Sequence, residues 1–319
     1  MDISVSDRIK RILIGQRVGG AFGYISDGWL NAASDLGLII DRWSGDVSQW
    51  RQFKPDLYIG CSGHKQPIPK DRGYCKIAIH VNPYGDVLID QISESLGNIK
   101  WVMDQKPDAV FGYGYINDRI YWEKWESNGI QWVPMPCAGD KIIFKQINEY
   151  VNRPNDLIYL GGRWPYKART IDAYLLPAIK TLREHGKVCK VHGWGDWPDG
   201  ICDGVLADDL SCQFINSGKI APCISELHTH QYGIDIPERA FKAALCGTLI
   251  IHDAVPFIKE MIPSAVVAQN PENFAKLCLH YINNEEERIT LVKKQQEEVL
   301  LNQTYHNRLL NLIKSVDSN

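Results

Sequence analysis

The sequence lacks several features that would reveal its function at once. It has no run of about 18 uninterrupted apolar residues, so no membrane-spanning helix is predicted, and its first residues carry no signal-peptide apolar region. Cationic residues are not in excess, because 35 Lys and Arg stand against 38 Asp and Glu, and a net charge of −3 gives no positive field to attract nucleic acid. These absences favour a cytoplasmic protein. They disfavour nucleic acid as a partner without excluding a local basic groove.

Metal and cofactor signatures are missing as well. The nine cysteines are an odd, scattered set with no C-x-x-C pair, which indicates free thiols, without a disulfide framework or a zinc site. The glycine-rich loop at 15–20 matches neither the G-x-G-x-x-G dinucleotide fingerprint nor the P-loop pattern, so a dehydrogenase and a P-loop ATPase are disfavoured. His228-x-His230 has no evident third ligand. We expect no metal and no permanently bound cofactor.

What the sequence does contain is a repeated alternation of β-type runs and helix-compatible segments. Its 319 residues predict two domains. The apolar runs lack strict alternation, which is typical of parallel strands buried on both faces. We therefore predict an α/β fold with a Rossmann-like domain at 1–150 and a second at 151–319. An amphipathic pattern from about 284 to 314 predicts a long or broken helix that packs back on the body.

In open α/β sheets, ligands bind beyond the carboxyl ends of the strands, so the loops there hold the candidate residues. Arg163, Lys167 and Arg169 directly follow the strand-like LIYLGG, and such cations favour a diphosphate; ordinary surface cations are the alternative. Gly193 and Trp194 follow a second strand, where a flat base could lie against the indole or the glycine could mark a simple turn.

Two further candidates follow strands of the first half. Gly19 and Gly20 either let a ligand approach the backbone closely or form a plain tight turn. His80 closes the apolar strand CKIAIHV at its carboxyl end. A histidine there either donates to a substrate hydroxyl or shuttles a proton, or is a satisfied structural residue.

The segment DIPERAFK at 235–242 predicts a helix whose N-terminus attracts an anion. Pro237 suits the first helical position, and Glu238 and Arg239 lie beside it. Glu238 and Lys242 are spaced i, i+4, so the alternative is that they pair with each other.

Several of these segments together resemble a known family. DLIYLGGRWPYKAR, VHGWG, IPERAFKAALCGTLIIHD and the closing T-Y-x-x-R are similar to the C-terminal domain of GT-B glycosyltransferases, in particular the spore-maturation (CgeB-like) type of the glycosyl transferases group 1. The resemblance is strong from about 156 to 313 and looser before that. From this resemblance we expect a GT-B fold and glycosyltransferase activity.

The resemblance implies two Rossmann-like domains that face a central cleft, and metal-independent, retaining transfer of a sugar from a UDP-, GDP- or ADP-sugar to a hydroxyl acceptor on a glycan, protein or small molecule. It also implies roles for individual residues. The diphosphate would be bound by Arg163, Lys167 and Arg169, the base by Gly193 and Trp194, the ribose or phosphate by Arg239, and the sugar or acceptor by His80, Gly19 and Gly20.

One position departs from the family pattern. The retaining relatives carry two acidic residues eight positions apart, but this chain has Ile234 and Lys242 there. Asp235 and Glu238 are the nearest acids and are the candidate catalytic carboxylates, although neither is in register. The departure leaves two alternatives open: a catalytically degenerate protein that binds a nucleotide or glycan, and a sugar transferase that acts on modified DNA bases.

Overall fold

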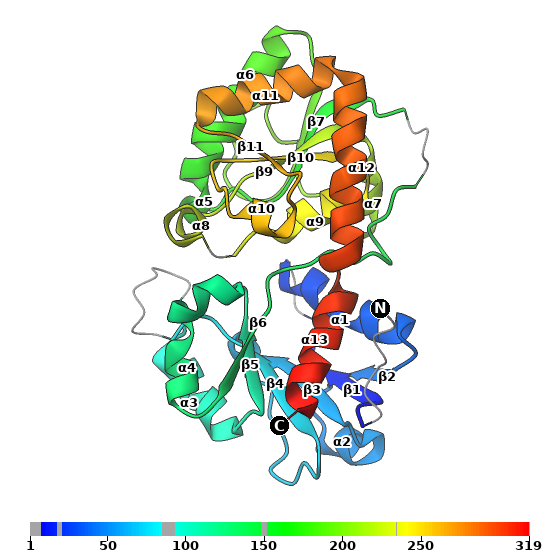
Figure 1. Cartoon of the computed structure of the whole chain (residues 1–319), viewed down its shortest axis with the longest axis vertical. Helices are drawn as coiled ribbons and strands as arrows, with labels where there is room; N and C mark the ends of the chain where they lie inside the picture. The colour runs from blue at the N-terminus through cyan, green and yellow to red at the C-terminus, as the bar shows by residue number, and fades with distance from the viewer. Residues whose placement is uncertain (1–7, 18–20, 85–92, 148–151, 234, 319) are drawn as a thin grey trace. The chain divides into compact units, whose positions relative to one another are not determined.

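The computed structural model describes residues 8–17, 21–84, 93–147, 152–233 and 235–318 (Figure 1). Contacts divide the chain into two compact units. Unit 1 comprises Met1–Asp140 and Tyr305–Asn319, and unit 2 comprises Lys141–Thr304. The predicted α/β class is confirmed, since both units are built on parallel sheets with helices between the strands.

Unit 1 holds a sheet of six strands in the order β2-β1-β3-β4-β5-β6, and every pairing in it is parallel. Its strands are β1 (Arg11–Ile14), β2 (Ile39–Arg42), β3 (Leu57–Cys61), β4 (Lys76–His80), β5 (Ala109–Gly112) and β6 (Gln131–Pro134). Its helices are α1 (Ala21–Asp35), α2 (Val47–Phe53), η1 (Ser62–His64), α3 (Leu96–Gln105), η2 (Ile116–Tyr121), α4 (Glu123–Ser127) and α13 (Tyr305–Asp317).

Unit 2 holds a parallel sheet of five strands in the order β11-β10-β9-β7-β8. Its strands are β7 (Asn155–Leu160), β8 (Cys189–His192), β9 (Gly218–Cys223), β10 (Leu249–His252) and β11 (Val266–Val267). Its helices are α5 (Pro165–Thr170), the π-helix η3 (Ile171–Leu175), α6 (Leu176–Glu184), η4 (Asp208–Leu210), α7 (Ser211–Asn216), α8 (Leu227–Tyr232), α9 (Glu238–Leu245), α10 (Ile258–Met261), α11 (Pro271–Asn283) and α12 (Glu285–Asn302).

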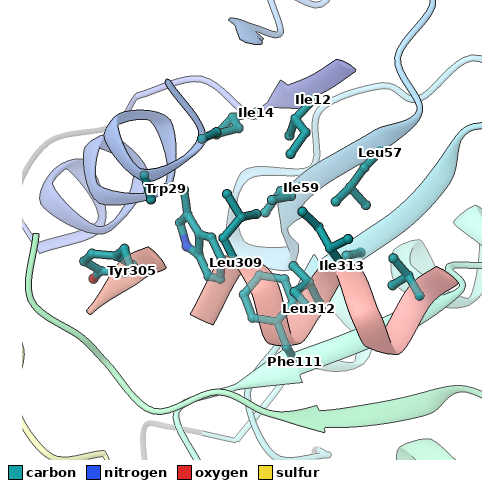
Figure 2. Close-up of a cluster of buried hydrophobic side chains, with 14 of the residues drawn as sticks. Ile12, Ile14, Trp29, Leu57, Ile59, Phe111, Tyr305, Leu309, Leu312 and Ile313 are labelled. Atoms are coloured by element: carbon teal, nitrogen blue, oxygen red, sulfur yellow. The ribbon is translucent and has the colours of Figure 1, made fainter. Parts of the chain in front are cut away.

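Each unit has its own hydrophobic core. In unit 1 the branched side chains of β1 and β3 pack on α1 and α13, as Figure 2 shows for Ile12, Leu57, Trp29 and Leu309. The core of unit 2 is built from β7, β9 and β10 with the helices η3, α6 and α11. Most tryptophans belong to unit 1, where Trp29, Trp43, Trp50, Trp122, Trp125 and Trp132 are buried. The abundance of indoles is therefore largely a matter of core packing.

The terminal helix corrects the predicted domain division. The amphipathic tail forms two helices, α12 and α13, and the chain leaves unit 2 between them. Leu309, Leu312 and Ile313 of α13 are buried in the unit 1 core beside Phe111 (Figure 2). The contact division therefore falls at 140/141, not 150/151, and assigns residues 305–319 to the first unit. Among the helices of the described ranges, none has the length and apolar content needed to cross a membrane.

Candidate functional site

The strand order of unit 2 places a topological switch point between β7 and β9, the position at which open α/β sheets form a ligand-binding crevice. The chain passes from β7 to β8 on one side of the sheet centre and then to β9 on the other. At such a reversal the connections leave in opposite directions, and ligands bind outside the carboxyl ends of the two strands. The residues that follow β7 and β9 therefore define the candidate site.

Arg239 of α9 links the two strand ends at this crevice. Its Nε donates to the carbonyl oxygen of Leu160, at 3.1 Å, and its Nη1 donates to that of Ile224, at 3.0 Å. The guanidinium also lies 4.7 Å from the ring centroid of Tyr159. A side chain at Gly161 would collide with Arg239 Nη2, so the glycine leaves the cation room at the end of β7.

Lys167 is buried against Glu226, a residue that the sequence reasoning did not single out. Lys167 Nζ lies 2.7 Å from Glu226 Oε1, and the two side chains are 4% and 16% exposed. Burial raises the pKa of Glu226, but the charge of Lys167 and the hydrogen bond from it outweigh burial, and the pKa is lowered overall. The Glu226 carboxylate therefore stays ionised just behind the end of β9.

The three predicted phosphate-binding cations do not share one point. Arg163 is held by Asp172 through Nε at 3.0 Å and Nη2 at 2.8 Å, and it also donates to the carbonyl of Asp196. Hydrogen bonding to Asp172 raises the pKa of Arg163. Arg169 is exposed and lies only two residues beyond Lys167 on α5, so it projects from another face of that helix. Of the three, Lys167 is the one buried at the crevice.

Gly193 and Trp194 border the same crevice. A Cβ at Gly193 would collide with the carbonyl of Gly161, because β7 and β8 run together here and Gly161 N–H donates to the carbonyl of His192 at 2.9 Å. Trp194 is 58% exposed, and its indole lies over Gly162. The close approach requires glycine, and the exposed ring offers a flat stacking surface.

The start of α9 differs by one residue from the prediction. Pro237 is the N-cap, with φ −60° and ψ 134°, and the helix begins at Glu238. Glu238 Oε2 lies 2.6 Å from Lys242 Nζ, and both side chains are buried. Lys242 Nζ also lies 4.9 Å from the ring centroid of Phe144. The intrahelical pair anticipated as the alternative is therefore present.

Asp235 has a different partner. It adopts a positive φ of 63°, and its Oδ2 lies 3.0 Å from Nε2 of His228, whose ring stacks on Tyr166. His228 and His230 sit on the helix α8, not on a strand, and His230 Nε2 instead meets Asp253 Oδ2 at 2.9 Å. In the described part of the chain, no group of three or more His, Cys, Asp or Glu side chains is arranged to hold a metal ion.

A buried cluster around Asp253 was not predicted. Asp253 accepts from Ser225 N at 2.7 Å, and its carboxylate meets both His230 and His252. Burial raises the pKa of Asp253, but its two histidine neighbours outweigh burial and lower it overall. The strand end TLIIHD was the available signal, since it places a histidine and an aspartate at the carboxyl edge of β10.

Unit 1 contains a pocket of about 60 Å³ at its own switch point, between β1 and β3. The walls include Trp29, Phe111 and Tyr113, with His64 and His80 among the polar lining. The space admits a few water-sized groups. His80, at the carboxyl end of β4, lines this cavity, whereas Gly19 and Gly20 lie outside the described residues.

Burial dominates the chemistry of His80. Its side chain packs 4.3 Å from the ring centroid of Tyr113 and 5.5 Å from that of Phe111, and Nδ1 lies 3.7 Å from Cys61 Sγ. Burial, and then the charge of nearby His64, lower the pKa of His80 to about 3. The imidazole is therefore neutral at neutral pH and can act as a hydrogen-bonding group without carrying charge.

Comparison with known proteins agrees with this architecture. Residues 169–314 match the family model described as "Glycosyl transferase-like". The fold is similar to that of T4 phage BGT in complex with UDP and Mn²⁺, with a TM-score of 0.64 and 12% identity over 96% of this chain and 99% of that one. Trehalose-6-phosphate synthase (OtsA) gives a TM-score of 0.64 and 10% identity over 97% and 99% of the two chains.

TarM is a further similar structure, with a TM-score of 0.58 and 10% identity over 82% of this chain; the chain spans about half the length of TarM, 54%. No curated protein matches the sequence. The fold of the chain is GT-B, as in these solved structures, and residues 169–314 are the part that matches the glycosyl transferase-like model. The CgeB-like subgroup and the cleft between the two units stay predictions.

Proposed function

We propose that this protein is a glycosyltransferase that transfers a sugar from a nucleotide-sugar donor to a hydroxyl acceptor, and that it binds the donor at the switch point of unit 2. The observation that carries the proposal is Arg239, a cation fixed by the carbonyls of Leu160 and Ile224 at the switch point. A positive charge already held in place stabilises a departing diphosphate without reorganisation during the reaction. BGT, which shares the fold, is a protein complexed with UDP.

The remaining residues of the crevice receive complementary roles. Lys167, paired with Glu226, adds a second cation, and Arg163, paired with Asp172, lies in the loop after β7. Gly161 leaves room for Arg239, Gly193 lets the backbones after β7 and β8 approach closely, and the exposed indole of Trp194 offers a stacking surface for the base. Because these cations would neutralise the diphosphate, transfer is proposed to be independent of metal. Equal turnover in EDTA and in Mg²⁺ or Mn²⁺ is the expected result.

We assign the candidate carboxylate role to Asp235 ahead of Glu238. The Asp235 side chain is 29% exposed, whereas that of Glu238 is 7% exposed and bound by Lys242. Retention of anomeric configuration is part of the proposal and derives from the resemblance of the C-terminal half to retaining enzymes. Proton NMR of the first product formed distinguishes retention from inversion.

The acceptor is proposed to reach the unit 1 pocket beside His80. A neutral imidazole accepts or donates a hydrogen bond to a hydroxyl without the cost of burying a charge. The proposed acceptor is accordingly a hydroxyl on a glycan, protein or small molecule.

The deciding experiment measures donor hydrolysis and transfer with UDP-, GDP- and ADP-glucose. Arg239→Gln is expected to lower kcat/KM by roughly 10- to 150-fold, which corresponds to about 1.5–3 kcal/mol for a hydrogen bond to a charged group. Lys187→Gln, which removes an exposed cation bound to Asn283, is the matched control and leaves kcat/KM unchanged. Turnover of no donor, or full activity of Arg239→Gln, contradicts the proposal.

The ion pair between Glu238 and Lys242 favours a second candidate, a degenerate protein that binds nucleotide without transfer, because it neutralises one of the two candidate acids. Tight UDP binding by calorimetry together with absent turnover would establish that alternative. The likeness to a DNA-modifying β-glucosyltransferase, at 13% identity, adds DNA with modified bases to the acceptors that the assay includes.

A further inference from the structure

Two of the nine thiols lie next to each other in unit 2. Cys212 Sγ, in α7, is 3.9 Å from Cys246 Sγ, at the residue that caps the C-terminus of α9. All nine cysteines are unbridged. A disulfide needs a separation of about 2 Å between the sulfurs, so the two sulfur atoms must move closer by about 2 Å for the bond to form.

The two thiols differ in accessibility and in charge. Cys212 is partly exposed, whereas Cys246 is fully buried. The hydrogen bond from Cys246, the nearby charge of Lys145 and the Asn216 amide, 3.5 Å from Cys212 Sγ, outweigh burial and lower the pKa of Cys212 to about 6. The same hydrogen bond and burial raise the pKa of Cys246. Cys212 Sγ also lies 3.6 Å from the carbonyl oxygen of Lys145, to which the protonated thiol donates, and either thiol can be the donor in the contact between Cys212 and Cys246. With its lowered pKa, Cys212 is the more readily ionised thiol of the two.

We propose that Cys212 and Cys246 form a peroxide-sensitive modification site that closes to an intramolecular disulfide. The Cys212 thiolate attacks one peroxide oxygen, the O–O bond breaks, and hydroxide leaves, which gives a sulfenic acid. Cys246 then loses its proton and attacks the Cys212 sulfur, and water leaves as the S–S bond forms. The two thiols together lose two electrons, and the peroxide gains them.

The surroundings favour closure within the chain. Arg153 Nη2 donates to the carbonyl of Cys246 at 2.9 Å, and Arg153 Nη1 donates to Thr248 Oγ1 at 2.8 Å, so the backbone beside the buried thiol is fixed. Cys212, on the short helix α7, is therefore the residue that moves when the disulfide forms. Because α9 also bears Arg239, the disulfide connects α7 to the helix whose cation is proposed to bind the nucleotide-sugar donor. That link to donor binding rests on the proposed function, but the cross-link itself does not.

The test treats the folded, full-length protein with an equimolar amount of hydrogen peroxide, blocks the remaining thiols with N-ethylmaleimide and digests the product for mass spectrometry. The expected result is loss of two alkylated cysteines, with one dithiothreitol-sensitive peptide that joins Cys212 to Cys246. On a non-reducing gel, the fraction of the protein that migrates as a monomer is the same before and after treatment. Donor turnover does not enter this readout, so failure of the proposed function leaves the result interpretable.

Three variants assign the steps. In Cys246→Ser, Cys212 stops at the sulfenic acid and is labelled by dimedone, whereas Cys212→Ser gives neither label nor cross-link. Cys202→Ser, which removes another partly exposed thiol of unit 2, is the control and still forms the cross-link. Preferential oxidation of Cys202, cross-links between chains, or sulfenic acid at Cys212 that persists in the unmutated protein would each overturn the proposal.

Discussion

At the scale of single residues, the buried His80 makes stability depend on pH. Its folded pKa, about 3, lies below its ordinary value of 6.5. Between these two values the unfolded chain binds a proton that the folded chain does not, so stability falls as pH drops below about 6.5 and is intact above it. The contribution of His80 approaches ~1.4 kcal/mol per pH unit within that window.

The prediction is that His80→Asn shows a flatter dependence of unfolding free energy on pH than the unmutated protein between pH 5 and 6.5. Urea denaturation at several pH values in that range measures both slopes. His185→Asn, which changes the exposed histidine that caps the C-terminus of α6, serves as the control and keeps the original slope. Equal slopes for the unmutated protein and His80→Asn would show that the imidazole is not held neutral by burial.

The pair of Lys167 and Glu226 gives a second prediction for residues. Both side chains are largely removed from water, so Lys167→Met or Glu226→Gln leaves one buried charge without this partner and costs about 3–5 kcal/mol of unfolding free energy. The double variant should recover much of that loss, because it leaves neither charge. A double-mutant cycle by urea denaturation checks this, and additive losses in the two single variants would contradict strong coupling.

These residue-level contacts mark the limit of what the sequence alone predicted. His80 was found because a strand end is visible in CKIAIHV, and Gly193 because a glycine follows a strand. Glu226 was not found, because it is 59 residues from Lys167 in the sequence and approaches it only on folding, and Asp172, nine residues beyond Arg163, was not singled out either. The sequence therefore predicted that the candidate residues lie at the carboxyl ends of the strands. It did not predict which cation is held there by hydrogen bonds.

At the scale of elements, the strands were predictable and the end of the chain was not. The apolar runs CKIAIHV and LIYLGG form β4 and β7 as expected, but the two-residue β11 was too short to be recognised. The amphipathic rhythm of the tail identified helices without showing which core they serve. Tyr305 packs 5.7 Å from Trp29, between ring centroids, and this contact between distant parts of the chain assigns α13 to unit 1.

The role of α13 leads to a prediction of stability. Leu309 is fully buried in the unit 1 core, so Leu309→Ala should cost about 2–5 kcal/mol of the unfolding free energy of that unit. Leu301, in α12, is 71% exposed, and Leu301→Ala should change stability by less than about 0.5 kcal/mol. Tryptophan fluorescence in urea reports both, because Trp29 lies beside Tyr305. Equal effects of the two substitutions would contradict the assignment of α13.

At the scale of the whole molecule, two separate cores imply two units that can respond separately to a ligand. A ligand that binds only the folded state of one unit stabilises that unit by mass action, by ~2.7 kcal/mol at one hundred times its dissociation constant. Because Arg239 and the proposed nucleotide site belong to unit 2, UDP should stabilise that unit. The tryptophans allow the distinction, since only Trp164, Trp194 and Trp197 lie in unit 2.

The Leu309→Ala variant turns this into a measurable prediction, because weakening unit 1 should separate the two unfolding transitions. In that variant, UDP is expected to raise the midpoint of the second transition, that of unit 2, and to leave the first unchanged. Calorimetry measures both midpoints, and Leu309→Ala combined with Arg239→Gln is the control that should abolish the shift. A shift of the first transition would instead assign the nucleotide to unit 1. That result would contradict the proposal that Arg239 binds the nucleotide-sugar donor.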